Sequence, residues 1–413
     1  MSKIKSIDLF AGCGGLMDGF EQSRKYDTIA VVEWEKAPCR NLEKRLRTKW
    51  KYKDANQRVI RFDIQRTEEL FSGWTGDADY DDSVGLDKLI GDANGIDVVI
   101  GGPPCQAYSI AGRVRDKHGM KNDYRNYLFE SYIKVLERYK PKVFIFENVP
   151  GILSAKPGDR PIIDIVRESF DEAGYHLLPD LSKAIIDFTD YGVPQNRKRI
   201  IIFGVRKGVF GEAQCDEMIN YFYETALPKY RVKKKKTVAE AIGDLPKLMP
   251  LEHDMKYEGS RTRHTLPEPF IANHVARWQS DRDVGIFQLL TEDIESGRNN
   301  YTSIEALKKL YTEKTGKTSN VHKYHVIRWN VPSNLIPAHL YKDGLRHIHP
   351  DSKQRRTITV REAARLQTFP DDYIFEGSNM ELYKMIGNAV PPDFAKCCAN
   401  AVYDLLRKYC EES

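Results

Sequence analysis

One cysteine of this sequence stands where a nucleophile is useful. Cys105 follows Gly101-Gly102-Pro103-Pro104, and that turn directly follows the apolar run Asp97-Val98-Val99-Ile100. Such a run is typical of a buried parallel strand, and open α/β sheets bind ligands at the carboxyl ends of their strands. Two glycines and two prolines fix the turn and present the thiol at its tip, whereas a structural cysteine normally lies within an element. We therefore predict that Cys105 is a nucleophile.

A carboxyl group follows the next apolar run. Glu147 ends Lys142-Val143-Phe144-Ile145-Phe146-Glu147, so it shares a strand-end edge with Cys105 in the predicted sheet. A carboxylate after such a run is partly buried and needs a partner, which in a structural role would be a salt bridge. The shared edge favours a functional role for Glu147.

Two arginines precede a further apolar run. Arg197 and Arg199 lie in Gln195-Asn196-Arg197-Lys198-Arg199, at the start of the predicted strand Arg199–Val205. Guanidinium groups at this place can hydrogen-bond a base or a phosphate. Taken alone, the segment is equally compatible with a solvated turn.

A glycine-rich turn near the amino terminus predicts a ligand site. In Asp8-Leu9-Phe10-Ala11-Gly12-Cys13-Gly14-Gly15 a strand gives way to a turn and then to a helix from Leu16. Glycines there let a ligand approach the backbone, although such turns also serve plain strand-to-helix packing. Glu33 ends the next predicted strand, where a carboxylate suits ribose hydroxyls. Trp34 beside it can stack on an adenine, or it is a core residue.

The elements that must position these groups alternate between strand and helix. Strands are predicted at 6–10, 28–33, 97–100, 142–147 and 199–205, and helices from 16, at 124–139 and at 162–173. This alternation predicts an α/β fold with an open, mostly parallel sheet and helices on both faces. From 207 to 351 the sequence is polar and interrupted by prolines, which indicates a separate, loop-rich second domain. Helices are again predicted at 359–367 and 391–408.

The positive charge of the chain is unevenly distributed. The net charge is +5, yet residues 206–355 hold 25 Lys and Arg against 19 Asp and Glu, and the remainder holds 39 against 40. A face that binds a polyanion explains this excess, and a solvated surface is the simpler alternative. The run Lys233–Lys236 precedes Thr237-x-x-Glu240, which predicts a helix start with a capping box.

Composition excludes several classes of protein. Hydrophobic residues make up 41% and charged residues 30%, which is ordinary for a globular chain. No stretch approaches the ~18 uncharged apolar residues of a membrane span, and no signal-peptide core is present near Met1. The seven cysteines include no Cys-x-x-Cys pair, so neither a disulfide framework nor a structural zinc site is expected, and we predict no metal.

The order of the motifs is similar to that of the DNA (cytosine-5) methyltransferase family, of the prokaryotic modification-enzyme type. The motifs are Phe-x-Gly-x-Gly from Phe10, Pro-Cys-Gln at 104–106, Glu-Asn-Val at 147–149, Gln-x-Arg-x-Arg at 195–199, Arg-Glu-Ala-Ala-Arg-Leu-Gln at 361–367 and Gly-Asn-Ala-Val-Pro-Pro at 387–392. The resemblance implies a Rossmann-like catalytic domain at 1–205 completed by 375–413, a target-recognition domain at 206–355 and a connecting segment at 356–374.

The resemblance also implies the chemistry. Cys105 would attack carbon 6 of a cytosine flipped out of duplex DNA, Glu147 would bind the N3 edge, Arg199 the base carbonyl, and Arg197 would brace the loop or the ring. S-adenosyl-L-methionine would be the methyl donor, and S-adenosyl-L-homocysteine the product. The residues implied in its pocket are Phe10, Gly12, Gly14, Glu33, Trp34, Asp63, Ile64, Pro103, Leu128, Asn388 and Val390.

Partners and context follow from the same resemblance. We expect double-stranded DNA as substrate, a monomer, a bacterial cytoplasmic location with association to the nucleoid, and a separately encoded restriction endonuclease as companion. Within the basic segment, Lys323, Lys342 and Arg346 are candidates for phosphate contacts. Three alternatives stay open: a tRNA-methylating relative, a DNA-binding regulator without activity, and an oxidoreductase, although the glycine-rich turn is not Gly-x-Gly-x-x-Gly.

Overall fold

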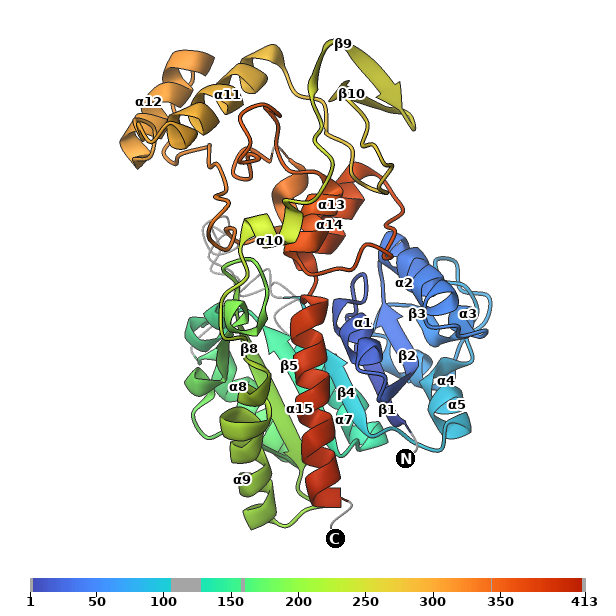
Figure 1. Ribbon diagram of the computed structural model, residues 1–413. Helices are drawn as coiled ribbons and strands as arrows, with labels where there is room; N and C mark the ends of the chain where they lie inside the picture. Colours follow the sequence, from blue (N-terminus) through green and yellow to red (C-terminus); the bar gives the residue numbers. More distant parts are fainter. Residues whose placement is uncertain (1–2, 105–127, 157–159, 343, 411–413) are drawn as a thin grey trace. The chain divides into compact units, whose positions relative to one another are not determined.

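The computed structural model describes residues 3–104, 128–156, 160–342 and 344–410, which form two compact units (Figure 1). The first unit comprises Met1–Gly192, Arg197–Lys233 and Ala389–Ser413, and the second comprises Val193–Asn196 and Lys234–Asn388. These bounds differ from the predicted breaks at 205 and 375. The reason is packing: helix α9 (Glu212–Tyr221) contacts the sheet of the first unit, and α13 (Val360–Leu366) contacts α14 (Asn379–Asn388) in the second.

An eight-stranded sheet forms the centre of the first unit, in the order β3-β2-β1-β4-β5-β8-β6, with β7 also paired to β8. The strands are β1 (Ile4–Leu9), β2 (Tyr26–Glu33), β3 (Val59–Arg61), β4 (Val98–Gly101), β5 (Val143–Asn148), β6 (Tyr175–Leu177), β7 (Ile185–Asp187) and β8 (Lys198–Arg206). Strands β1 to β5 pair in parallel, so the predicted, mostly parallel sheet is confirmed. Strand β8 runs antiparallel to β5, and its start therefore lies beside the end of β5.

Nine described helices accompany this sheet. They are α1 (Gly15–Gln22), α2 (Lys36–Thr48), α3 (Ala55–Arg58), α4 (Thr67–Ser72), α5 (Gly85–Asp92), α7 (Leu128–Tyr139), α8 (Ile162–Glu172), α9 and α15 (Pro392–Cys410). Helix α15 runs in front of the sheet beside α1 (Figure 1). The two helices approach closely because Gly15 and Gly19 lack side chains: a Cβ at Gly15 would lie 2.0 Å from the Val390 carbonyl oxygen. The carboxyl-terminal segment thus packs into the first unit.

The second unit contains more regular structure than its prolines indicate. It holds α10 (Val238–Ile242), the hairpin of β9 (Pro250–Tyr257) and β10 (Ser260–His264), α11 (Asp281–Glu295), α12 (Ile304–Thr315), α13 and α14. Ser280 and Ser303 cap the amino termini of α11 and α12, and the predicted capping box of Thr237 and Glu240 is confirmed. Helices α11 and α12 share a small core that includes Phe287 and Leu310. Residues 207–351 therefore contain regular helices and strands, although their prolines indicate a loop-rich domain.

Residues Val193–Asn196 belong to the second unit, although the residues before and after them along the chain belong to the first. The Gln195 side-chain amide donates to the Leu366 carbonyl at 2.9 Å and accepts from the Ile336 N–H at 3.1 Å. Gln195 is fully buried, so these bonds replace its lost hydration. Across the described ranges, no helix is long and apolar enough to cross a membrane.

Candidate active site

Three strand ends converge at one edge of the first unit's sheet. Strand β4 ends at Gly101, the parallel strand β5 ends at Asn148, and the antiparallel strand β8 begins at Lys198. The reversed direction of β8 brings Arg199 beside Glu147: Arg199 Nε lies 2.9 Å from Glu147 Oε1, and each side chain is 12% exposed. This edge of the sheet therefore holds a carboxylate and a guanidinium group in contact.

The turn after β4 packs against the carboxylate of Glu147. A Cβ at Gly102 would lie 2.7 Å from Glu147 Oε2, so only glycine fits there without displacing the carboxylate. The sequence motif indicated a tight turn but not this contact, which joins two strands that are distant along the chain. Cys105 follows Pro104 of the same turn and lies outside the described residues, so its role as nucleophile stays a prediction.

Arg197 has a different position from Arg199. Its side chain is buried, and one Nη donates to the Ala389 carbonyl oxygen at 3.0 Å. Burial lowers the pKa of this guanidinium, with the charge of Arg199 acting in the same direction. Arg197 thus ties the start of β8 to the segment that precedes α15, which suits a bracing role.

Gly12 and Gly14 of the glycine-rich turn have different surroundings. Phe10, Gly12 and Gly14 all have positive φ angles, of 57°, 56° and 76°. A Cβ at Gly14 would lie 2.5 Å from a Leu42 methyl carbon, so this glycine allows the helix to pack closely. A Cβ at Gly12 would meet nothing within 4 Å, so open space adjoins the turn at that residue.

Glu33 is held by the backbone of this turn. Its Oε2 accepts from Gly12 N at 2.8 Å, and its Oε1 accepts from Trp34 N and Glu35 N, both at 2.9 Å. Burial raises the pKa of Glu33, although these N–H groups oppose the change. Trp34 is 54% exposed, so its indole is not the core residue of the alternative interpretation.

The family of C-5 cytosine-specific DNA methylases matches residues 4–404 of this chain. The chain belongs to this family. The Type II methyltransferase M.Bpa9945I of Bacillus paralicheniformis is 35% identical over 455 aligned residues, which include 97% of this chain and 98% of that protein. The Type II methyltransferase M.XorII of Xanthomonas oryzae pv. oryzae is 30% identical over 99% of this chain and 86% of its own length.

A solved structure of low identity shares the fold. It is described as a DNA modification methyltransferase encoded within a prophage (E. coli), with a TM-score of 0.63, 22% identity and coverage of 98% of this chain and 100% of that one. At this identity the similarity concerns the fold alone. The predicted family and the mostly parallel α/β fold are confirmed, and the alternative of an oxidoreductase is excluded.

The remaining predicted cofactor residues of this methylase divide between the two units. Asp63 and Ile64 follow β3, whose neighbour Phe62 donates its N–H to the Glu33 carbonyl at 3.1 Å. Pro103, Leu128 and Val390 are buried in the first unit. Asn388 is exposed and is the last residue of α14, in the second unit.

A buried acid in β1, just before the glycine-rich turn, was not among the predicted site residues. Asp8 is fully buried, its Oδ2 accepts from Met17 N at 3.1 Å, and no donor reaches its Oδ1 within the described chain. Burial raises its pKa well above the ordinary value. Because it accepts from an N–H in the first turn of α1, Asp8 orients the start of that helix. The signal for it was present, since a charged residue inside an apolar strand needs a partner.

Proposed function

We propose that this DNA cytosine-5 methyltransferase moves a methyl group from S-adenosyl-L-methionine to carbon 5 of a cytosine flipped out of duplex DNA, through a covalent bond between Cys105 and carbon 6. The observation that carries the proposal is the Glu147–Arg199 pair at 2.9 Å, beside the turn that leads into Cys105. Carbon 5 is a poor nucleophile until a thiolate adds at carbon 6, which splits one difficult step into two easier ones.

The free groups of this pair are complementary to one edge of cytosine. Among the described residues, Glu147 Oε2 has no donor, and Arg199 uses Nε for Glu147 and Nη1 for the Lys198 carbonyl. An acceptor thus lies beside an unused donor, the second Nη of Arg199. We infer that Glu147 binds a protonated N3 and that Arg199 donates to the O2 carbonyl. This arrangement withdraws electrons from the ring as the Cys105 thiolate adds.

Proton and thiol steps complete the cycle. After carbon 5 is methylated, a base removes the proton from carbon 5, and the bond from Cys105 to carbon 6 breaks to release the thiolate. We assign none of the described residues as that base. We propose that a water molecule at the edge of the sheet accepts the proton. Arg197 holds the start of β8 through Ala389, which keeps Arg199 in register with Glu147.

The first unit fits the methyl donor. When bound, S-adenosyl-L-methionine supplies an electrophilic methyl group, and S-adenosyl-L-homocysteine remains. Glu33 Oε2 accepts one backbone N–H and retains an acceptor site for a ribose hydroxyl. Gly12, which faces open space, donates to this carboxylate, and Trp34, whose indole is exposed, follows Glu33 along the chain. We propose that these residues, with Asp63 and Ile64 at an adenine, hold the adenosine.

The second unit supports a role in DNA recognition. A cytosine stacked within a duplex cannot reach a thiol of the enzyme, so it must be flipped out. We propose that the second unit binds the surrounding duplex, that the chain acts as a monomer in the bacterial cytoplasm, and that it protects a site also cut by a separate restriction endonuclease. The Type II names of its relatives support that pairing.

One assay tests the substrate and the reaction together. The purified chain is incubated with S-adenosyl-L-methionine labelled at the methyl group and either duplex DNA or tRNA. We expect label in DNA, as 5-methylcytosine in the nucleosides, and none in tRNA. Label in tRNA alone, or no label in either nucleic acid, would overturn the proposal. Methylation elsewhere on cytosine would overturn the carbon-5 assignment.

A further inference from the structure

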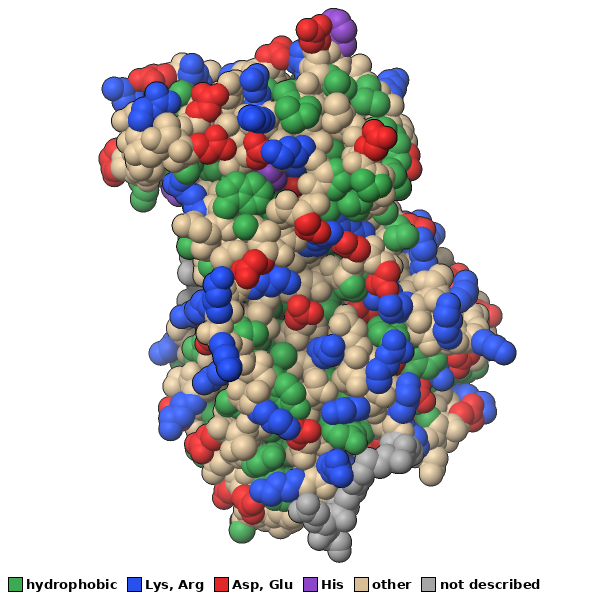
Figure 2. All heavy atoms as spheres, viewed as in Figure 1, with side chains coloured by type: hydrophobic (Ala, Val, Ile, Leu, Met, Phe, Trp, Pro, Cys, Tyr) green, Lys and Arg blue, Asp and Glu red, His purple; other side chains and the backbone are tan. Residues whose placement is uncertain are grey.

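Lys and Arg side chains are spread over the visible face of each unit and interspersed with Asp and Glu, so colour alone singles out no binding surface (Figure 2). The ion pairs of the arginines are more informative. Most arginines of the second unit have a carboxylate partner: the pairs are Arg261–Asp254, Arg263–Asp281, Arg282–Asp283, Arg356–Glu362, Arg361–Asp371 and Arg365–Asp244. Charges neutralised in this way attract a polyanion weakly.

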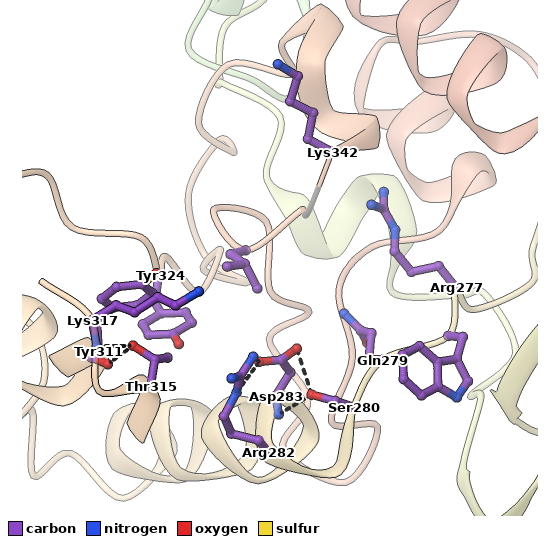
Figure 3. A pocket seen from close by; sticks show the side chains of 12 residues that line it. Arg277, Gln279, Ser280, Arg282, Asp283, Tyr311, Thr315, Lys317, Tyr324 and Lys342 are labelled. Carbon is purple, nitrogen blue, oxygen red and sulfur yellow. Dashed lines mark hydrogen bonds and ion pairs between the residues drawn. The ribbon is translucent and has the colours of Figure 1, made fainter. Parts of the chain in front are cut away.

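A cavity of the second unit mixes paired and unpaired polar groups. It measures about 340 Å³, and some of its polar groups bond to one another (Figure 3). Asp283 accepts from Ser280 and Arg282, and Thr315 donates to the Tyr311 carbonyl. Its one amide, Gln279, is engaged at both ends by Thr357. Lys317 and Lys342 also line the cavity, but no hydrogen bond among the described residues orients either ammonium group.

Arg328 and Arg346 differ from these paired arginines. The segments that bear them pair through backbone hydrogen bonds, from His325 N to the Leu345 carbonyl at 2.9 Å and from Ile327 N to the Ile348 carbonyl at 3.1 Å. Burial, and then the charges of Arg328 and Arg346, lower the pKa of His325 to about 4. Arg346 is exposed and Arg328 is half-buried. Within the described residues, neither forms an ion pair. The charge of Asp293 partly offsets the lowering of the pKa of Arg328, but its carboxylate accepts hydrogen bonds from the N–H groups of Asn300 and Tyr301.

Arg346 is also held in place by a neutral group. His322 Nδ1 lies 3.0 Å from the Tyr324 carbonyl, so it carries the proton and donates. His322 Nε2 is then an acceptor, and an Nη of Arg346 lies 3.4 Å from it. A neutral imidazole therefore orients the guanidinium without cancelling its charge. The loop bearing Arg346 is fixed as well, because its carbonyl accepts from Asn334 Nδ2 at 3.0 Å.

We propose that Arg346, oriented by His322, and Arg328, on the paired backbone segment, bind a backbone phosphate of the DNA duplex. Positioned guanidinium groups without carboxylate partners are suited to a phosphate, which they can bind with two parallel hydrogen bonds. The proposal rests on the proposed function for its ligand, and it replaces two of the three candidates from the sequence. Within the part of the chain that the structure describes, no side-chain hydrogen bond orients Lys323 or Lys342 in this way.

Salt dependence of binding tests the proposal. The full-length chain is titrated against a fluorescein-labelled duplex of mixed sequence at several NaCl concentrations, as wild type and as Arg346→Gln, Arg328→Gln and Arg346→Lys. Each lost phosphate contact should lower the slope of log affinity against log salt by about 1. Arg346→Lys should recover most of the slope because it keeps the charge. Arg298→Gln is the matched control, since Arg298 is exposed and, of the residues that the structure describes, its side chain bonds only to Ser296.

The outcomes separate this proposal from the proposed function. An unchanged slope in Arg346→Gln and Arg328→Gln would overturn the phosphate assignment, even if the wild type methylates DNA. A slope that falls equally in Arg298→Gln would also overturn it, because the effect would then be one of net charge. Relaxed discrimination between two duplexes at an unchanged slope would make these residues base readers. Melting temperatures of the variants, compared with wild type, show that the slopes come from folded protein.

Discussion

At the scale of single residues, the site depends on how Glu147 is oriented. Arg199 engages one carboxylate oxygen and Gly102 leaves room for the other. Replacing Glu147 by Gln keeps the shape but removes the charge that favours a protonated N3. We expect the single-turnover rate of methylation to fall by at least about 100-fold, the range of positioned proton-transfer groups, with donor affinity unchanged.

The control for this variant is Glu130→Gln, which alters an exposed carboxylate at the start of α7. Rapid-quench kinetics give the rate, and calorimetric titration gives the donor affinity. If donor affinity fell while the single-turnover rate held, Glu147 would be a cofactor or structural residue instead.

Gly102 provides a second test at this scale. A methyl group there would lie 2.7 Å from Glu147 Oε2 and must displace it. A displacement of about 1 Å in a catalytic group costs on the order of 100-fold in rate, so Gly102→Ala should lower kcat strongly with little change in KM for the donor. Gly208→Ala places its methyl in open space and should be silent. Equal kcat values in the two variants would refute a positioning role.

At the scale of elements, the direction of β8 assembles the site. The apolar pattern of 199–205 predicts a strand, but both faces of a buried strand are apolar in either direction, so the pattern does not give its orientation. The strand ends at 101 and 147 were predictable, because parallel strands place their carboxyl ends at one edge. The contacts Gly102–Glu147 and Gln195–Leu366 were not, since they join segments distant along the chain.

Helices α11 and α12 were not predicted from the sequence, for a different reason. Their apolar residues are few, and they bury them mainly against each other and against 324–348. A hydrophobic stripe that faces only a small local core gives a weak periodic signal, and the surrounding prolines obscured it. The serines that cap both helices were visible in the sequence and would have marked their starts.

The packing of α1 on α15 makes a prediction at this scale. A Cβ at Gly19 would lie 2.4 Å from Ala395 Cβ and 2.5 Å from the Pro392 carbonyl oxygen. Because backbone atoms cannot yield easily, Gly19→Ala should lower the free energy of unfolding by about 1–3 kcal/mol. Gly91→Ala, in α5 and open to solvent, should be neutral or slightly stabilising. Urea denaturation measures both, and the opposite order would contradict the described packing.

At the scale of the whole molecule, the two units should respond differently to acid. In the second unit, burial lowers the pKa of His264 and His325 to about 4 and that of His347 to about 3, from an ordinary 6.5. Unfolding lets them bind protons, so stability is lost as pH falls from about 6.5 to about 4, by at most on the order of 3 kcal/mol per group. In the first unit, burial raises the pKa of Asp8 and Glu33, which favours folding as pH falls.

We therefore expect acid to unfold the second unit first. Circular dichroism and hydrogen exchange between pH 7 and pH 4 would show early loss of protection in α11 and α12, while β1, β4 and β5 stay protected. His347→Gln should flatten the pH dependence, whereas His253→Gln, which alters an exposed imidazole, should not. Simultaneous loss of protection in both units would contradict the expectation.

The central claim is a covalent bond between Cys105 and the target cytosine, and the most direct measurement traps it. Duplex DNA with 5-fluorocytosine at the methylated position is incubated with the chain and S-adenosyl-L-methionine, and the product is analysed by denaturing gel and mass spectrometry. Because fluorine cannot leave as a proton does, wild type and the control Cys410→Ala should form a stable protein–DNA complex joined at Cys105, and Cys105→Ala should form none. A complex in Cys105→Ala, or a cross-link at another residue, would contradict the account.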